Sequence, residues 1–181
     1  MTANNATHDE SPGAVAAPPW LDRAAWPFAP HFASVRDGQM HYVDEGTGPM
    51  TVLVHGTPTW GFEWRHVIAH KRAKTRLIAP DHMGFGLSAR PQVSYTPEAH
   101  ATRFSQFMDQ LLGPTAATQT DGRVHLVIHD FGGPIALDWA LQNVDRLRHL
   151  TIVNTWMWPF DDDPSMRKRA QMAGGALGRF L

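Results

Sequence analysis

The stretch from Arg123 to Trp139 constrains the fold more than any other part of the chain, because its pattern changes abruptly in the middle. Val124 to Ile128 is a short apolar run rich in β-branched residues, which predicts a buried strand. From Pro134 onwards, apolar residues recur in a background that favours a helix. Between the two lies the sequence His-Asp-Phe-Gly-Gly. The pattern predicts a strand, a sharp turn and a helix, with Asp130 at the apex of the turn.

A turn of this kind is a nucleophile elbow, which lifts one side chain clear of the strand end. Gly132 and Gly133 allow the helix backbone to pass close to the strand, and the helix N-terminus favours negative charge near the apex. An aspartate is ionised at neutral pH, so it can attack an sp3 carbon without a base and form an alkyl ester. The alternative is that Asp130 is only the N-cap of the helix, a position that aspartate also favours.

Length and composition describe one globular domain with a sizeable core, since the chain has 181 residues, 43% of them hydrophobic. The formal net charge of −1 gives no reason to expect nucleic acid or an acidic membrane surface as a partner. No apolar run approaches membrane-spanning length, and the N-terminus does not resemble a signal peptide. There is no cysteine, which excludes disulfides and thiolate metal sites. A cytoplasmic location is therefore the default expectation.

The rest of the chain alternates strand and helix patterns, which predicts an α/β fold. Asp37-Gly38 is a tight hairpin signal. Strands are predicted over 31–36, 39–44, 51–54, 76–80 and 147–154, and helices over 61–70 and 97–112. We therefore expect a mostly parallel sheet with an antiparallel hairpin at its N-terminal end. The expected organisation is a disordered tail over 1–19, a core over 20–160 and the start of a helical segment over 161–181.

Three of the predicted strands end in unusual residues. These endings are His55-Gly56-Thr57-Pro58, Asp81-His82-Met83-Gly84 and His129-Asp130-Phe131-Gly132. In open α/β sheets, ligands bind at the carboxyl ends of the strands. The three turns together predict a functional site at that edge of the sheet.

The same three motifs, in this order, resemble the α/β-hydrolase family and, within it, the haloalkane dehalogenase group. The resemblance covers roughly Trp26 to Phe160. An aspartate at the apex is typical of the branch that attacks carbon through a carboxylate, which also contains epoxide hydrolases and β-lactone decarboxylases. The resemblance implies the α/β-hydrolase core sheet, truncated in this chain at the start of the cap domain. It also implies a small halogenated alkane or related electrophile, with water, as the reaction partners.

The resemblance implies a role for each residue of the motifs. Asp130 is the nucleophile, and the backbone N–H groups of Thr57 and Phe131 form the oxyanion hole when water cleaves the ester. His55, Gly56 and Pro58 shape the turn that aims the Thr57 amide, while Gly132 and Gly133 serve the elbow. Asp81, Gly84 and Gly86 brace the adjacent loop, and His129 is structural.

Two positions depart from the pattern of the dehalogenases. These enzymes commonly place Trp directly after the nucleophile, where its indole N–H holds the departing halide, but Phe131 has no such donor. Many also place Asn where Thr57 stands. The substitute donors are the Thr57 hydroxyl or an indole, with the pocket candidates being Trp60, Trp156, Trp158 and His82. For each of these Trp residues the alternative is core packing.

Hydrolysis of the ester needs a general base, which in this family is a His far C-terminal to the nucleophile, held by an acid. The last of the eleven histidines is His149, and the position matching the acid of some relatives is Asn154. We therefore expect an N-terminal portion of a longer hydrolase. Three functions stay open at this point: a dehalogenase, an epoxide hydrolase or β-lactone-processing relative, and a truncated fragment that is catalytically inactive.

No cofactor is expected, because no glycine-rich loop carries the lysine that a nucleotide site needs. His66 and His70 lie four residues apart on a predicted helix, but no zinc motif surrounds them. No metal site is therefore expected. The oligomeric state stays open.

Overall fold

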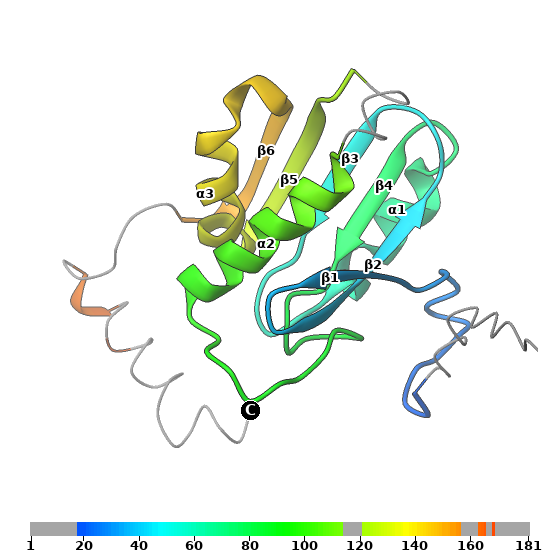
Figure 1. Ribbon diagram of the computed structural model, residues 1–181. Coiled ribbons are helices and arrows are strands. Elements are labelled where there is room, and N and C mark those ends of the chain that lie inside the picture. Colours follow the sequence, from blue (N-terminus) through cyan, green and yellow to red (C-terminus); the bar gives the residue numbers. More distant parts are fainter. Residues whose placement is uncertain (1–17, 114–120, 157–162, 166–167, 169–181) are drawn as a thin grey trace, which may run out of the picture.

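The computed structural model describes residues 18–113, 121–156, 163–165 and 168, which contain one six-stranded sheet with helices on both of its faces (Figure 1). The strands are β1 (His31–Val35), β2 (Gly38–Glu45), β3 (Met50–Val54), β4 (Arg76–Pro80), β5 (Val124–Asp130) and β6 (Leu147–Thr155). The α-helices are α1 (Arg65–Lys71), α2 (Pro97–Leu111) and α3 (Gly132–Gln142). Two short 3₁₀ helices are η1 (Gly61–Trp64) and η3 (Val144–Arg146). The predicted α/β fold class is confirmed.

The strand order in the sheet is β1-β2-β4-β3-β5-β6. β1 pairs with β2, and β2 with β4, in antiparallel register. β4, β3, β5 and β6 are parallel to one another. The sheet is therefore mostly parallel with an antiparallel pair at its N-terminal end, as predicted, and the parallel strands bring their carboxyl ends to one edge.

The hairpin between β1 and β2 turns at Arg36 and Asp37, since Val35 is the register partner of Gly38, the first residue of β2. The φ angles of Asp37 and Gly38 are +73° and +153°. Aspartate adopts positive φ more readily than most residues, and glycine adopts it freely. The Asp-Gly signal therefore locates the hairpin to within one residue, because β1 ends at Val35 and β2 begins at Gly38, one residue before the predicted ends at 36 and 39.

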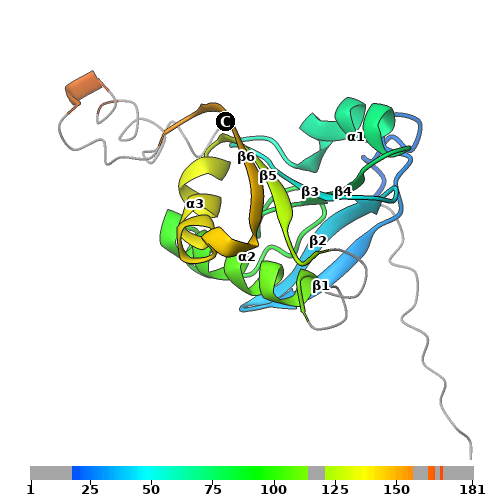
Figure 2. The ribbon, with the colours of Figure 1, turned by 90° about the horizontal axis from the view of Figure 1, so that it is seen from above.

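Helices α2 and α3 cover one face of the sheet, and α1 covers the other (Figure 2). Under α2 and α3 lies the larger apolar cluster, which includes Val52, Phe104, Ile128 and Trp139. Under α1 lies a smaller cluster of Trp26, Phe28, Val43, Leu53, Ile68, Leu77 and Ala79. Because both of its faces are covered, every residue of β3 is buried.

The ends of two helices follow local chemistry. Thr96 caps α2 by accepting a hydrogen bond from the Ala99 amide, and Pro97 occupies the first turn, as predicted. The helix predicted over 61–70 begins instead as η1 and continues as α1. Its first turn is tightened because the Glu63 amide bonds the Trp60 carbonyl three residues back, at 3.0 Å.

β6 is an edge strand among the described residues and pairs only with β5 there. Its side chains are largely exposed, including Leu150, Ile152 and Val153. The predicted tail over 1–19 and helical segment over 161–181 fall outside the described residues, except for 18–19, 163–165 and 168. No helix in the described part of the chain is long and apolar enough to cross a membrane.

Candidate active site

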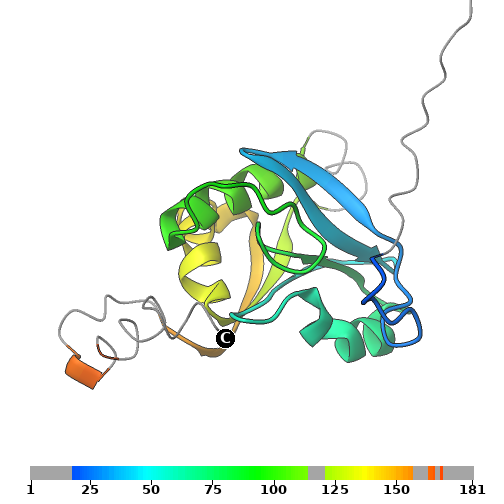
Figure 3. The same cartoon turned by 90° about the horizontal axis from the view of Figure 1, so that it is seen from below.

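The turns that follow β3, β4 and β5 meet at the carboxyl edge of the sheet, which Figure 3 views from below. The His82 backbone N–H donates to His55 Nε2 at 2.9 Å, joining the β3 and β4 turns. The Thr57 backbone N–H donates to Asp130 Oδ2 at 3.0 Å, joining the β3 and β5 turns. The convergence of these three turns was predicted from the sequence, and the structure shows it.

Asp130 sits at the apex between β5 and α3 with a φ angle of +46°, which is uncommon for a residue that is not glycine. Its carbonyl oxygen accepts a hydrogen bond from the Thr155 hydroxyl at the end of β6. α3 begins directly after Phe131, whose φ and ψ angles of −63° and −19° are already helical, and no side-chain hydrogen bond caps the helix there. The Asp130 carboxylate accepts from the Thr57 amide, and no hydrogen bond from an amide of α3 to this carboxylate is found among the described residues, so the helix-cap alternative finds no support here.

Three glycines of the predicted motifs stand where a side chain would collide with the elbow. A Cβ on Gly56 would lie 2.5 Å from the Asp130 Cβ and 2.8 Å from its Oδ2. A Cβ on Gly132 would lie 2.7 Å from the His55 carbonyl oxygen, and one on Gly133 would overlap the Thr155 hydroxyl. These close approaches bring the Thr57 amide and the Asp130 carboxylate within hydrogen-bond distance.

Asp81 braces the loop after β4. Its side chain is fully buried and accepts hydrogen bonds from the amides of Gly61 and Leu87, each at 2.8 Å. It also bonds His41 Nδ1 at 2.9 Å. A Cβ on Gly86 would collide with this carboxylate, so the loop can close around Asp81 only with glycine at that position.

Two buried histidines support the turn that carries Thr57. His55 Nδ1 donates to the Gly56 carbonyl at 2.8 Å while its Nε2 accepts from the His82 amide, which assigns the proton to Nδ1. Burial lowers the pKa of His55, and burial with the neighbouring His55 and His100 lowers the pKa of His82 well below its usual value. Both rings are therefore neutral at pH 7 and serve as hydrogen-bonding groups of fixed geometry.

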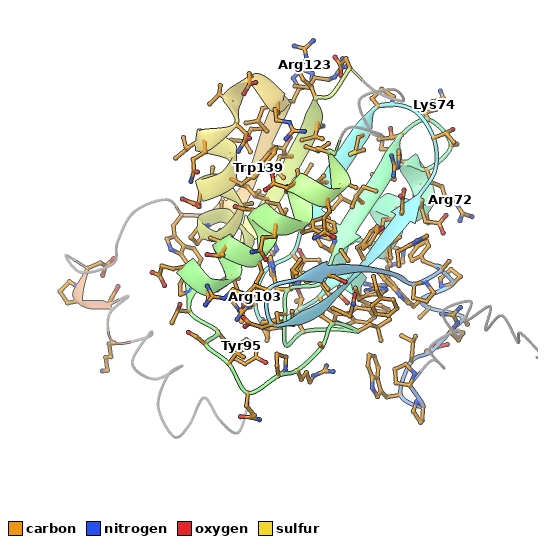
Figure 4. All side chains as sticks on the ribbon, viewed as in Figure 1. Arg72, Lys74, Tyr95, Arg103, Arg123 and Trp139 are labelled. Carbon is orange, nitrogen blue, oxygen red and sulfur yellow. The ribbon has the colours of Figure 1, made fainter. Side chains whose placement is uncertain are left out.

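A cavity of about 430 Å³ lies against the elbow, which is within the size range of small-molecule sites. Thr57 and Phe131 line it on one side, and Phe85, Tyr95 and His100 line it on another. Figure 4 shows Tyr95 in the loop before α2, at the end of the sheet opposite Arg123. The cavity therefore opens at the edge where the carboxyl ends of the parallel strands meet.

The predicted pocket candidates fall in different places. Trp60 packs against Trp26, with ring centroids 4.7 Å apart, and is stacked on Phe62, so it belongs to the aromatic cluster and does not line this cavity. His82 is 2% exposed and lies behind the cavity wall. The core-packing alternative therefore describes Trp60.

Of the remaining two tryptophan candidates, the structure describes Trp156 but not Trp158. The Trp156 ring contacts the Phe131 ring, with centroids 5.9 Å apart, which places an indole beside the elbow. Trp158 lies outside the described residues.

Sequence reasoning missed His100, which comes from α2 and lines the cavity. A signal for it was present. His100 lies four residues before Phe104, on the helix face predicted to be apolar, and a polar residue on such a face calls for an explanation. The sequence alone cannot show that the N-terminal end of this helix face borders a cavity, while the rest of the face packs in the core.

The remaining histidines lie elsewhere. His129 Nδ1 bonds Glu63 Oε1 at 3.2 Å, so it is tied to η1, and Glu63 also bonds the Thr59 hydroxyl. His70 Nδ1 donates to the carbonyl of His66 on the surface of α1. In the part of the chain that the structure describes, no group of three or more potential ligands is arranged to hold a metal ion, and no imidazole is hydrogen-bonded to the Asp130 carboxylate.

The arrangement suits attack by a carboxylate. One oxygen of Asp130 is held by a main-chain amide, while no described group bonds the other. Oriented amide donors stabilise negative charge that develops on an oxygen. Such a carboxylate, beside a cavity of this size, can attack a carbon electrophile and form an ester. Hydrolysis of the ester by water then restores the carboxylate.

Comparison with known proteins agrees with this geometry. Residues 50–180 match the model of a family described as the alpha/beta hydrolase fold. The sequence is 40% identical over 141 residues to haloalkane dehalogenase 2 of Mycobacterium tuberculosis, covering 77% of this chain and 46% of that protein. It is 35% identical over 150 residues to cis-3-alkyl-4-alkyloxetan-2-one decarboxylase of Xanthomonas campestris, covering 77% of this chain and 48% of that protein.

A solved structure shows the same likeness. The haloalkane dehalogenase DatA from Agrobacterium tumefaciens C58 superposes with a TM-score of 0.68 at 29% identity, covering 82% of this chain and 50% of that one. The chain thus spans about half the length of the relatives it matches.

Proposed function

The chain belongs to the α/β hydrolase fold family, and from this premise we propose that it carries the carboxylate nucleophile of a haloalkane dehalogenase-like hydrolase. The observation that carries the proposal is the 3.0 Å hydrogen bond from the Thr57 amide to Asp130 Oδ2 at the apex of the elbow. A helix cap or a surface carboxylate needs no such amide from a turn 73 residues away in the sequence. An oxygen that becomes an oxyanion needs one.

In the first step, Asp130 Oδ1 attacks the carbon that bears the halogen. The new C–O bond forms as the carbon–halogen bond breaks, the bonding pair leaves with the halide, and an alkyl ester remains on Asp130. No proton moves in this step, so it requires no base. The cavity beside Thr57 and Phe131 is the space in which the alkyl group lies.

In the second step, water attacks the carbonyl carbon of the ester. Negative charge develops on Oδ2, where the Thr57 amide already donates, and the Phe131 amide is the proposed second donor. Collapse releases the alcohol and restores the carboxylate. This step needs a general base. Ester formation needs none, so it is the step that the experiment detects.

The test is alkylation of Asp130 by 1-bromobutane. We expect one butyl group on the chain, located on Asp130 by peptide mass spectrometry, with one bromide released for each ester formed. Asp130→Asn should lower the rate of bromide release at least about a thousandfold, because an amide is a poor nucleophile. A cooperative thermal melt of the variant near that of the parent protein shows that folding is not the cause.

The outcome that contradicts the proposal is equally direct. If the folded parent protein releases no halide and gains no adduct from chlorinated or brominated alkanes of several lengths, Asp130 is not the nucleophile of a dehalogenase-like reaction. Adduct without alcohol means that this chain carries out ester formation alone, which is the fragment hypothesis. Multiple turnovers contradict that hypothesis.

A second candidate is an oxygen heterocycle as the electrophile, because one relative at 35% identity is a decarboxylase of oxetan-2-ones. Phe131 and Thr57 bring no indole or amide side chain to hold a halide, which such a substrate does not require. Release of carbon dioxide from a cis-3,4-dialkyloxetan-2-one, or of a diol from an epoxide, without activity on haloalkanes favours this candidate.

A further inference from the structure

The cavity beside the elbow contains a buried imidazole that no described protein group uses. His100 is 3% exposed, and what remains of its surface lines the cavity. Its Nδ1 is buried and has no hydrogen-bond partner among the described residues. Its ring neighbours are His82, Phe85 and Tyr95, with centroids 5.6, 6.1 and 5.9 Å away. The ring is held by packing, and its hydrogen-bonding capacity is unfilled.

The charge state of this ring follows from its surroundings. Burial, then the positive charge of Arg103, then His55, lower the pKa of His100 to about 4. The ring is therefore neutral at pH 7, with one N–H and one lone pair. Buried N–H groups without a partner are rarer than unpaired acceptors, so the sealed Nδ1 keeps the lone pair and Nε2 keeps the proton. The edge of the ring that can reach the cavity then offers a donor.

The other polar side chains that line the cavity are hydrogen-bonded to the protein or exposed, and Thr57, whose hydroxyl is a further possible donor, is among the exposed ones. The Tyr95 hydroxyl donates to the Pro91 carbonyl at 2.5 Å, and Arg90 donates to the Gly86 carbonyl at 2.9 Å. Gln92 is exposed. His100 is therefore the deeply buried polar group of the wall whose donor is free for a ligand.

The Tyr95 ring is 40% exposed, but its inner side is in contact with the loop after β4 and with α2. A Cβ on Gly84 would lie 2.7 Å from the Tyr95 ring, and the Arg103 guanidinium lies over the same ring at 5.8 Å. Arg103 also bonds Asp37 and the Ser94 carbonyl. His100 itself is buried on α2 with its ring against that of His82, whose amide bonds His55 in the turn that carries Thr57, so its position relative to the elbow is preorganised.

We propose that His100 is a specificity-determining residue that donates a hydrogen bond from Nε2 to an oxygen acceptor on the substrate, such as an ether, hydroxyl or carbonyl oxygen. The site would thus select electrophiles that carry an oxygen over plain haloalkanes. The inference rests on the proposed function, since the electrophile must be attacked by Asp130. A site built to bond an oxygen rejects the analogue that lacks it, because the polar group of the protein is left unpaired.

The test uses isosteric pairs in which an ether oxygen replaces one CH₂ group: 1-bromo-2-methoxyethane against 1-bromobutane, and 1-bromo-3-methoxypropane against 1-bromopentane. The quantity measured is the rate of bromide release in the first turnover, divided by the rate of each bromide with acetate in water. We expect the parent protein to prefer at least one ether about tenfold over its alkane, the effect of one hydrogen bond.

The variants locate the effect. His100→Phe should remove the preference of the parent protein, and His100→Gln, which keeps a donor, should retain part of it. His66→Phe makes the same substitution on the opposite face of the sheet and is the matched control, since His66 is exposed on α1. Asp130→Asn measures alkylation elsewhere on the chain, which is subtracted.

The outcomes separate this inference from the proposed function. Alkylation of Asp130 without any ether preference in the parent protein overturns the role of His100 and leaves the nucleophile standing, and this result does not depend on any variant folding. A preference that survives His100→Phe also overturns it. Absence of an adduct from all four bromides contradicts the nucleophile itself and removes this inference with it.

Discussion

Gly56 and Asp130 show how much of the site depends on the absence of one side chain. The Asp130 side chain occupies the volume that a Cβ on Gly56 would fill. Such a Cβ would lie 2.5 Å from the Asp130 Cβ and 2.8 Å from the Asp130 Oδ2. Real Cβ atoms essentially never approach so closely, so either the β3 turn or the elbow has to move if that glycine is replaced. Because Thr57 follows directly, any such movement also alters its hydrogen bond to Oδ2.

At this scale we predict that Gly56→Ala lowers the rate of Asp130 alkylation by 1-bromobutane on the order of a hundredfold, because misplacing a reacting group by about 1 Å costs that much. Gly113→Ala is the control, since a Cβ there meets its nearest neighbour at an ordinary 3.4 Å. Rates are compared on proteins whose melting curves show that they are folded. An unchanged rate for Gly56→Ala would mean that the close contact is not part of the site.

The neighbouring strands β5 and β6 illustrate how position in the sheet, at the scale of the element, decides what a side chain contributes. Ile128 and Ile152 are register partners on adjacent parallel strands. Ile128 is fully buried in the cluster under α2 and α3, whereas Ile152 is 51% exposed. The same residue type thus removes very different areas of apolar surface from water.

We therefore predict that Ile128→Ala lowers the free energy of unfolding by about 2–5 kcal/mol, which is the usual cost of a core cavity of that size. Ile152→Ala should cost less than about 1 kcal/mol, since much of its side chain is already in water. Urea unfolding followed by circular dichroism measures both. Equal costs for the two substitutions would contradict the burial that the structure assigns to these strands.

In the whole molecule, three buried imidazoles connect separate parts of the fold. His55 follows β3, His82 follows β4 and His100 lies on α2, with ring centroids 4.2 Å and 5.6 Å apart along the series. The pKa of each ring is lowered, chiefly by burial. Their protonation is therefore linked to the stability of the entire domain.

The sign of this linkage follows from the two states of His100. Above pH 6.5 the ring is neutral in both the folded and the unfolded chain, so it imposes no penalty. As the pH falls from 6.5 to about 4, the unfolded ring takes up a proton and the folded ring does not, so unfolding is favoured. Its contribution to the loss of stability reaches up to about 3 kcal/mol at the lower end of this window.

We predict that the free energy of unfolding falls between pH 6.5 and pH 4, with His55 and His82 adding to the effect of His100. Urea titrations at several pH values should show that His100→Gln lowers the slope against pH by about 1.4 kcal/mol per pH unit, the equivalent of one proton. A variant whose slope equals that of the parent protein would show that His100 is not the buried neutral group described above.

The sequence by itself determined the elements, the sheet class and the elbow, because these depend on short-range patterns. Alternating and four-residue periodicities, the Asp-Gly hairpin and the Thr-Pro helix start act over a few residues. The Thr-Pro start of α2 lies where the pattern predicts it, and the hairpin turn lies one residue earlier, at Arg36 and Asp37. The approach of the Thr57 amide to Asp130 follows from the same logic, since parallel strands bring their carboxyl ends together.

Only the tertiary structure decided which side chains surround the carboxylate. Trp60 was assigned to the aromatic cluster and not to the cavity, and His82 to the layer behind the wall. Tyr95 and His100 instead form the wall, although they come from a loop and a helix that carried no catalytic motif. The physical reason is that a cavity is the space left between elements distant in sequence, and no local pattern encodes where that space remains.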